Sequence, residues 1–283
     1  MKLSNNDLIK VVAPSCSIEK EDLVELNNGK KFVESLGLKI SLDSRIDSND
    51  IKVKINSLNE ALKSNAKLVI AACGGEGAIN VIKCIKIDKV KVPVMGFSDI
   101  TSILNYIYLE KGIITYHGCN LKTFGREGER KIDKKCFDDF KEAFFNEKYL
   151  IEKEEFKVIK EGNAEGTLIG GNLTCFLQLA KIYEIDLKDK ILLIEDLGYE
   201  TNAKMFAENF NKLKKVKNFN LLKGIILGNY EVETKEKIED IYLENIDLNI
   251  PVIKTDSIGH GKTNLIVPIG KKVKISNNKI KIM

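Results

Sequence analysis

One serine and one histidine in this chain of 283 residues lie in segments suited to chemistry rather than to packing. Ser98 follows a short apolar run that ends in Gly-Phe-Ser-Asp, and helix-forming sequence comes next. We therefore expect Ser98 on the sharp turn between a buried strand and a helix, where its hydroxyl stands clear of the sheet. The backbone N–H of Asp99 would then point at the group attacked. His260 lies in a Gly-His-Gly loop, and the two residues together indicate a serine hydrolase.

A serine hydroxyl needs a base to take its proton, and the base needs a carboxylate to orient it. Glu195 and Asp196 end a buried apolar strand, where α/β proteins place their sites. The glycines beside His260 allow unusual backbone angles and close approach of a substrate. Structural alternatives remain open for each residue. Ser98 could have only a structural role in the turn, and Asp99 could be a helix N-cap. The two carboxylates could be solvated or cap a helix, and His260 could be incidental.

A second strand-to-helix turn has the sequence Gly74-Gly75-Glu76-Gly77. Its backbone N–H groups could face an oxyanion or bind phosphate, or the segment could be only a tight turn. The spacing matches neither GxxxxGK[ST] nor GxGxxG, which disfavours a nucleotide. Around Ser98 the usual elbow pattern is half matched, because Gly96 occupies position −2 but Ile100 occupies +2. The other histidine, His117, is interpreted as structural.

The elements that must position these residues alternate along the chain, which predicts an α/β fold with a parallel, helix-covered sheet. We expect an N-terminal α/β domain over residues 1–120, a charge-rich connector over 121–162, and a C-terminal α/β domain with a β-rich end over 163–283. A capping box at Ser57-Leu58-Asn59-Glu60 predicts the start of a helix. Strands are expected at 8–13, 38–42, 68–72, 92–97, 191–194, 224–227, 252–253, 273–275 and 280–282, and helices at 23–36, 57–64, 103–109, 137–145, 173–183, 203–213 and 235–244, with another from the glycine turn to about 85.

Composition excludes several classes of protein. The 45 basic residues include only Arg45, Arg126 and Arg130 as arginine, so a nucleic-acid surface is not expected. Six cysteines without CxxC spacing predict a reducing compartment and no metal site. No signal-peptide core or membrane-spanning run is found, so we expect a cytoplasmic protein that binds no membrane.

Taken together, these segments resemble the LD-carboxypeptidase family of serine peptidases, which also contains the microcin C self-immunity peptidases. The resemblance covers nearly the whole chain, and its motifs occur in the family's order. They are Val11-Val12-Ala13-Pro14-Ser15, Gly74-Gly75-Glu76-Gly77, Gly96-Phe97-Ser98-Asp99-Ile100-Thr101, Tyr116-His117-Gly118, Gly170-Gly171-Asn172-Leu173, Leu193-Ile194-Glu195-Asp196-Leu197-Gly198, Gly259-His260 through Asn264, and Pro268-Ile269-Gly270.

The resemblance implies a role for each candidate. Ser98 would be the nucleophile, His260 the general base and then acid, and Glu195 the carboxylate that orients the imidazole. The backbone amides of Asp99 and of the turn at Gly74 and Gly75 would form the oxyanion hole. No metal and no cofactor are implied, and the site would lie in a cleft between the two domains.

The implied activity is a serine carboxypeptidase that cleaves the L,D amide bond to a terminal D-amino acid in cytoplasmic muropeptides, as in murein recycling. The alternative is a microcin C-type immunity peptidase that cleaves peptidyl-aminoacyl-nucleotide amides. Many LD-carboxypeptidases carry Arg before the glycine turn and Tyr within it, whereas this chain has Cys73 and Glu76. That departure bears on the substrate more than on the peptidase activity.

Two further classes remain to be separated from these peptidases. One is a catalytically silent α/β binding protein, and the other is a cysteine-dependent amidotransferase-like enzyme that uses Cys73 or Cys84. The expected partner is a small peptide substrate. The sequence does not determine the oligomeric state, and a homodimer is compatible with it.

Overall fold

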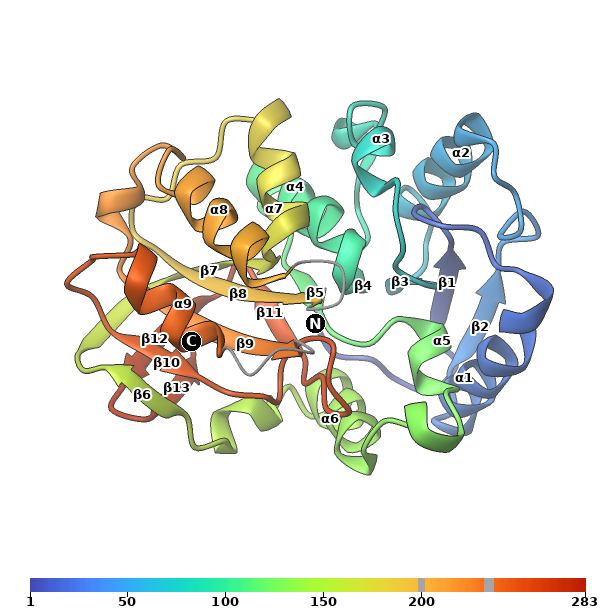
Figure 1. Ribbon diagram of the computed structural model, residues 1–283. Coiled ribbons are helices and arrows are strands. Elements are labelled where there is room, and N and C mark those ends of the chain that lie inside the picture. Colours follow the sequence, from blue (N-terminus) through green and yellow to red (C-terminus); the bar gives the residue numbers. More distant parts are fainter. Residues whose placement is uncertain (198–201, 232–236) are drawn as a thin grey trace.

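The computed structural model describes residues 1–197, 202–231 and 237–283, and it forms an α/β molecule with two sheets (Figure 1). The predicted fold class is confirmed, including the parallel N-terminal sheet and the β-rich end. Gly198 of the predicted motifs and the start of the helix expected at 235–244 lie outside the described residues.

The first sheet contains six strands in the order β11-β5-β4-β3-β1-β2. Five of them are parallel, and β11 runs antiparallel to β5. The central strands are apolar and buried along their length, as expected of strands covered on both faces. The bounds are β1 (Leu8–Val12), β2 (Lys39–Leu42), β3 (Leu68–Ala71), β4 (Val94–Gly96), β5 (Thr115–His117) and β11 (Val267–Ile269).

The second sheet contains seven strands in the order β13-β12-β7-β8-β9-β10-β6. Strands β7 to β10 are parallel, while β12, β13 and β6 run antiparallel to their neighbours at the two edges. The bounds are β6 (Lys157–Lys160), β7 (Asn163–Asn172), β8 (Lys190–Leu197), β9 (Gly224–Glu231), β10 (Val252–Lys254), β12 (Lys272–Ser276) and β13 (Lys279–Ile282).

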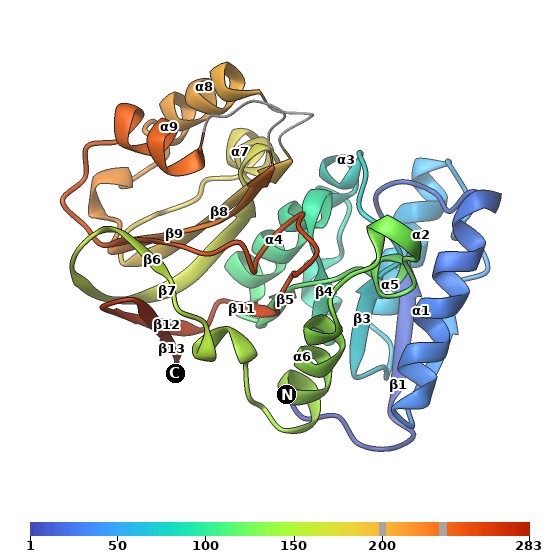
Figure 2. The same cartoon turned by 60° about the horizontal axis from the view of Figure 1, so that its bottom comes forward.

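Helices cover these sheets in two layers, which Figure 2 shows from a second direction. Helices α2, α3 and α4 share one apolar core with α7, α8 and α9, and this core spans both sheets. Helices α1, α5 and α6 pack against the opposite face of the first sheet. The α-helices are α1 (Leu23–Ser35), α2 (Ile51–Leu62), α3 (Ala78–Ile82), α4 (Thr101–Lys111), α5 (Leu121–Phe124), α6 (Lys134–Phe145), α7 (Leu173–Ile182), α8 (Ala203–Leu213) and α9 (Ile238–Asn245). Short 3₁₀ turns are η1 (Lys20–Asp22), η2 (Ile87–Lys89), η3 (Ser98–Ile100), η4 (Gly128–Arg130), η5 (Leu150–Lys153) and η6 (Phe219–Leu221).

The predicted start of the second helix was wrong. Helix α2 begins at Ile51, because Asp50 is its N-cap and accepts a hydrogen bond from the backbone of Lys52. Ser57 lies inside this helix and donates instead to Asp43 on the loop after β2 (2.8 Å). A tertiary partner therefore explains the serine that looked like a cap in the sequence.

Strands β5, β6, β7 and β11 were not predicted, and the connector expected at 121–162, which contains β6, contributes more than a link. Its helix α6 buries Phe140 and Phe144 in the core beside the first sheet. Within the described ranges, no helix combines the length and hydropathy needed to cross a bilayer.

Candidate active site

Ser98 occupies the predicted turn between β4 and α4. Its backbone is in the left-handed region (φ 63°), which non-glycine residues adopt at a cost in energy. Such strain persists only where the surroundings hold it, and it is common at functional sites. On one side the turn is held by Asn120, whose side-chain oxygen accepts a hydrogen bond from Phe97 N (3.3 Å). The position of the serine at a sharp strand-to-helix turn is confirmed.

Asp99 anchors the other side of the same turn. Its buried carboxylate accepts hydrogen bonds from Ser15 Oγ (2.5 Å) and from the backbone N–H of Ala78 (2.7 Å). Burial raises the pKa of Asp99, while these two hydrogen bonds oppose the rise. The residue therefore caps α3 rather than its own helix, and it ties the Ser98 turn to the segment that follows the glycine turn.

The turn at Gly74 and Gly75 lies directly against Ser98. A Cβ at Gly74 would lie 2.9 Å from Ser98 Cβ and 3.2 Å from its Oγ, so a side chain there would collide with the serine. Gly75 has φ +114°, a conformation that L side chains rarely adopt. This close approach places backbone beside the hydroxyl, which fits the predicted oxyanion hole.

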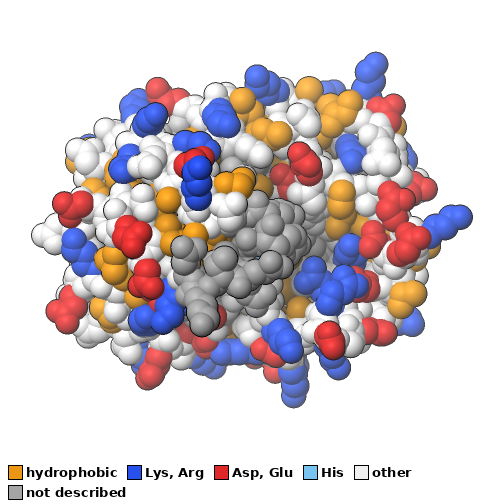
Figure 3. Space-filling view, viewed as in Figure 1, with side chains coloured by type: hydrophobic (Ala, Val, Ile, Leu, Met, Phe, Trp, Pro, Cys, Tyr) orange, Lys and Arg blue, Asp and Glu red, His pale blue; other side chains and the backbone are white. Residues whose placement is uncertain are grey.

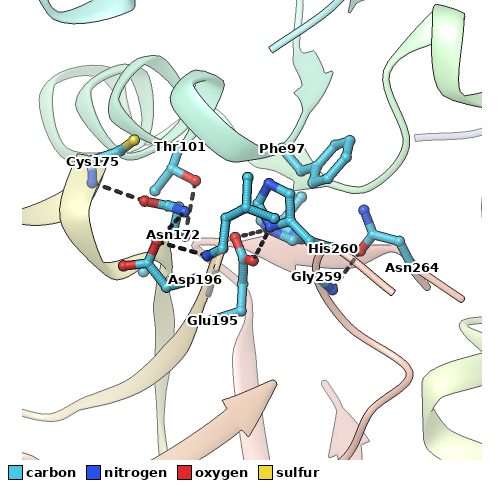
Figure 4. Close-up of polar contacts among 12 residues, drawn as sticks. Phe97, Thr101, Asn172, Cys175, Glu195, Asp196, Gly259, His260 and Asn264 are labelled. Carbon is cyan, nitrogen blue, oxygen red and sulfur yellow. Dashed lines mark hydrogen bonds and ion pairs between the residues drawn. The ribbon is translucent and has the colours of Figure 1, made fainter. Parts of the chain in front are cut away.

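Glu195 and His260 meet in the structure although 65 residues separate them (Figure 4). Glu195 lies on β8 and is fully buried, and its Oε2 is 2.7 Å from His260 Nδ1. His260 lies on the loop between β10 and β11, and Gly259 allows the loop to approach. A Cβ at Gly259 would fall 2.8 Å from Glu195 Oε2, and its φ is +111°. The sequence prediction that Glu195 contacts the imidazole is confirmed.

A second histidine lies on the other oxygen of the same carboxylate. His117, at the end of β5, is fully buried with Nε2 3.5 Å from Glu195 Oε1. The sequence analysis took this residue as structural and missed the contact. The one sequence signal for a role of His117 was its position in the Tyr116-His117-Gly118 motif. Burial by itself would raise the pKa of Glu195, but the charge of His260 and hydrogen bonds from His117 and His260 outweigh it and hold that pKa at about 2.

The neighbouring carboxylate of Asp196 has a different environment. Its oxygens accept from Asn172 Nδ2 (2.9 Å) and from Thr174 Oγ1 (2.8 Å), on the side away from His260 (Figure 4). Burial, followed by repulsion from Glu195, raises the pKa of Asp196 to about 6. The two acidic residues at the end of β8 therefore divide into one that faces the histidines and one that binds the end of β7 and the first turn of α7.

Helix α4, which begins just after Ser98, is hydrogen-bonded to the second sheet. The side chain of Asn105 donates to Gly170 O (2.9 Å) and accepts from Gly170 N (2.8 Å). Thr101 Oγ1 accepts from Asn172 N (3.1 Å). These bonds join α4 to β7, which pairs with β8, so they fix the serine's helix relative to the strand that carries Glu195.

Ser98 and His260 line one pocket of about 190 Å³ between the two sheets. The ring of Phe97 lies 5.0 Å from that of His260, centroid to centroid. Lys122 and Arg126 bring positive charge, and Figure 3 shows basic side chains gathered over α5. The described lining residues are Cys16, Cys73, Gly74, Gly75, Phe97, Ser98, Asn120, Lys122, Thr123, Arg126, Leu197 and His260.

The two basic residues differ in their partners. Lys122 forms an ion pair with Asp22 (2.8 Å). No described carboxylate lies within ion-pair distance of Arg126, and its buried Nε has no hydrogen-bond partner among the described residues. A guanidinium in this state can bind a substrate carboxylate. The described part of the chain holds no cluster of three or more His, Cys, Asp or Glu side chains placed to bind a metal.

Comparisons with known proteins identify relatives of this chain. Two family models match, the LD-carboxypeptidase N-terminal domain over residues 9–118 and the LD-carboxypeptidase C-terminal domain over residues 165–275. A protein of Bacillus subtilis named "Probable murein peptide carboxypeptidase" is 28% identical, over 95% of this chain and 89% of its own. The microcin C7 self-immunity protein MccF of Escherichia coli is 26% identical, over 87% and 84%. The crystal structure of an MccF-like protein from Bacillus anthracis superposes with a TM-score of 0.85 at 27% identity, over 99% and 97%.

Proposed function

Because the chain belongs to the LD-carboxypeptidase family and is a serine peptidase, we propose that Ser98, His260 and Glu195 are its catalytic triad. The observation that carries this proposal is the 2.7 Å contact between Glu195 and His260 in a pocket that Ser98 also lines. A buried carboxylate on Nδ1 sets the imidazole tautomer, so Nε2 is the nitrogen that would accept the serine proton.

Each group then has a step in amide hydrolysis. Ser98 Oγ attacks the carbonyl carbon while His260 takes its proton, and the ionised Glu195 stabilises the imidazolium that forms. The negative oxygen of the tetrahedral intermediate accepts hydrogen bonds from the backbone N–H groups of Asp99 and of the turn at Gly74 and Gly75. His260 returns the proton to the leaving amine, and water hydrolyses the acyl-enzyme by the same route.

The proposed substrate is a cytoplasmic muropeptide, cleaved at the L,D amide to its terminal D-amino acid. A carboxypeptidase must recognise a terminal carboxylate, and Arg126 supplies an unpaired guanidinium among the described residues of the pocket. The pocket of about 190 Å³ is smaller than the roughly 300 to 1,000 Å³ of drug-sized ligand sites, which suits a small leaving residue. The relative named as a murein peptide carboxypeptidase supports the same substrate class. Six free cysteines fit a reducing compartment.

A second candidate is cleavage of the amide in a peptidyl-aminoacyl-nucleotide of the microcin C type. The similarity to MccF and to the MccF-like protein of Bacillus anthracis favours it. Cys73 and Glu76, which replace the Arg and Tyr of many LD-carboxypeptidases, also leave the substrate open.

The two candidates are separated by incubating the protein with a muropeptide ending in D-alanine and, separately, with processed microcin C. Mass spectrometry would follow the products. We expect loss of D-alanine, no cleavage of the matched peptide ending in L-alanine, and little cleavage of the nucleotide. The reverse preference would establish the second candidate instead.

The control is Ser98→Ala, which removes a small hydroxyl and should leave the thermal midpoint nearly unchanged. Its turnover should fall on the order of 10⁴ to 10⁶, as for other triad members. A fluorophosphonate should label the wild type at Ser98, which a silent binding protein would not show. Inhibition by iodoacetamide with an active Ser98→Ala variant would indicate a cysteine enzyme instead.

A further inference from the structure

Two cysteines lie side by side in the wall of the Ser98 pocket. Cys16, on the loop after β1, is partly exposed, and Cys73, just after β3, is buried. Their sulfur atoms are 3.0 Å apart, and both residues line the pocket with Ser98 and His260. Both are free thiols, and the triad mechanism uses neither of them.

The Cys16 thiol also supports the glycine turn. Its Sγ lies 2.8 Å from the carbonyl oxygen of Gly74, to which it donates a hydrogen bond. That carbonyl belongs to the same planar peptide group as the N–H of Gly75. The thiol therefore holds one end of a peptide unit whose other end is a proposed oxyanion donor. The contact is close, since a Cβ at Gly75 would lie 2.7 Å from Cys16 Sγ.

We propose that Cys16 and Cys73 form a reversible thiol modification site, which a hydroperoxide oxidises to a disulfide and which thereby slows catalysis at Ser98. The modification follows from the sulfur geometry alone. Its effect on catalysis rests on the proposed function, because it acts through the turn at Gly74 and Gly75.

The oxidation balances with hydrogen peroxide as the two-electron oxidant. The Cys16 thiolate attacks one peroxide oxygen, the O–O bond breaks, and hydroxide leaves as the sulfenic acid forms. The Cys73 sulfur then attacks the Cys16 sulfur, an S–S bond forms, and water leaves with the thiol proton. A thiol reductant reverses the reaction by exchange through a mixed disulfide.

Cys16 is suited to the first step by its ionisation, and Cys73 is placed for the second step by the 3.0 Å contact between the two sulfur atoms. A hydrogen bond from the Cys73 thiol, opposed by burial and aided by the charge of Lys122, lowers the pKa of Cys16 to about 7. The contact with Cys16 and burial raise the pKa of Cys73. Thiols that sense peroxide are typically accessible, of low pKa and next to a resolving cysteine. The pair meets each of these conditions.

Oxidation changes the support of the turn in two ways. The disulfide removes the proton that Cys16 donates to the Gly74 carbonyl. It also draws the two sulfurs from 3.0 Å to the bonding distance of about 2.05 Å, and one of them belongs to Cys73, the residue that precedes Gly74. Losing one oxyanion donor altogether costs roughly 10² to 10³ in turnover. We expect a loss of about tenfold or more here, because the turn is shifted rather than removed.

Peptide mapping tests the modification without any assay of hydrolysis. The Cys84→Ser protein, which lacks the exposed cysteine, would be treated with hydrogen peroxide, alkylated, digested and analysed by mass spectrometry. We expect a peptide that links Cys16 to Cys73, its loss after dithiothreitol, and unmodified thiols at the buried Cys119 and Cys136. Absence of this link, or oxidation of Cys16 to sulfinic acid without it, would overturn the proposal.

Turnover and fluorophosphonate labelling of Ser98 test the effect on catalysis. For each rate, the ratio of the value after peroxide to the value before it should fall to about one tenth or less in Cys84→Ser and recover with dithiothreitol. It should stay near one in Cys84→Ser proteins that also carry Cys73→Ser. A disulfide that forms while both ratios stay near one would overturn the regulatory role. A disulfide in a protein whose Ser98 is never labelled would contradict the triad proposal and leave the modification site standing.

Discussion

Glu195 contacts both histidines of the chain, and its ionisation is the central electrostatic feature of the site. Its pKa of about 2 keeps the carboxylate charged throughout the neutral range. The attraction to His260 that lowers this pKa must favour the protonated imidazole equally, because the interaction is mutual. A base held in this way is oriented and strengthened by one side chain, Glu195, which is the carboxylate that the resemblance implied.

We predict that Glu195→Gln lowers both the rate and the pH at which activity is lost on acidification. Activity requires neutral His260, so it falls as the pH drops through the imidazole pKa, about 6.5 when unperturbed. Removing the carboxylate charge should move this midpoint to lower pH. The measurement is kcat/KM from pH 5 to 8 for the variant and the wild type. An acid limb at the same pH in both proteins would remove Glu195 from this role.

We predict that Arg126→Met weakens recognition of substrates with a free terminal carboxylate. A hydrogen bond to a charged group contributes about 1.5 to 3 kcal/mol, so kcat/KM should fall roughly 10- to 100-fold. The wild type should lose a similar factor on a substrate ending in carboxamide, and the variant should lose little more on that substrate.

Arg130→Met is the matched control, because Arg130 pairs with Glu25 and is not among the described residues of the pocket. It should leave kcat/KM unchanged. Equal discrimination between carboxylate and carboxamide by Arg126→Met and the wild type would show that another group binds the carboxylate.

At the scale of elements, α6 is held by a buried acidic side chain. Asp139 accepts hydrogen bonds from Leu150 N (3.0 Å) and Ile266 N (2.6 Å), so it joins α6 to the segments before β6 and β11. Burial raises the pKa of Asp139 to about 6, although these hydrogen bonds oppose the rise. Asp139 therefore links segments more than 120 positions apart in the sequence. When the pH exceeds its pKa, its side chain carries a buried negative charge.

This pKa predicts how stability changes with pH. The folded value of about 6 exceeds the ordinary 3.8, so the proton is held more tightly in the folded state. The associated stability is complete below pH 3.8 and is lost as the pH rises through 6. A difference of about 2 between the two pKa values corresponds to at most about 3 kcal/mol.

Asp139→Asn cannot ionise and should escape that loss. The free energy of unfolding of this variant, relative to the wild type, should therefore increase by up to about 3 kcal/mol between pH 4 and pH 7. Urea denaturation at each pH measures it. Asp138→Asn, at the exposed neighbouring position, should show no such trend. Parallel pH profiles for Asp139→Asn and the wild type would contradict the assignment.

The whole molecule depends on segments that cross between its two sheets. Strand β11 comes from the C-terminal part of the chain but pairs with β5 in the first sheet. One apolar core extends from α2 and α3 to α8 and α9. Ser98 lies before the connector and the other two residues of the proposed triad lie after it, so the proposed mechanism requires both halves in contact.

We predict that fragments 1–133 and 134–283, expressed separately, are each inactive. The first fragment lacks α6 and β11, which leaves the edge of β5 unpaired and apolar surface exposed. Coexpression should restore activity only where the fragments associate, which size-exclusion chromatography would show. Hydrolysis by either fragment alone would contradict a triad assembled from both halves.

The sequence by itself determined the α/β class and the turn at Ser98, because these depend on local patterns, while the roles in the candidate triad came from the resemblance to a family. Apolar runs, glycines and the residues at strand ends follow rules of period and turn geometry that act within about ten residues. The same reasoning misplaced the start of α2, since Ser57 had a partner outside the range of a local motif.

Only the tertiary structure decided which groups meet. His117 contacts Glu195, and Asp196 bonds to Asn172 instead of the histidines. Strand β11 pairs with β5 in the first sheet, and Cys16 lies beside Cys73. Each of these contacts joins residues from different strands or loops, and each depends on strand order and on the packing of helices between two sheets. A single sequence carries no local signal for such contacts, because their energy arises only after the chain has folded.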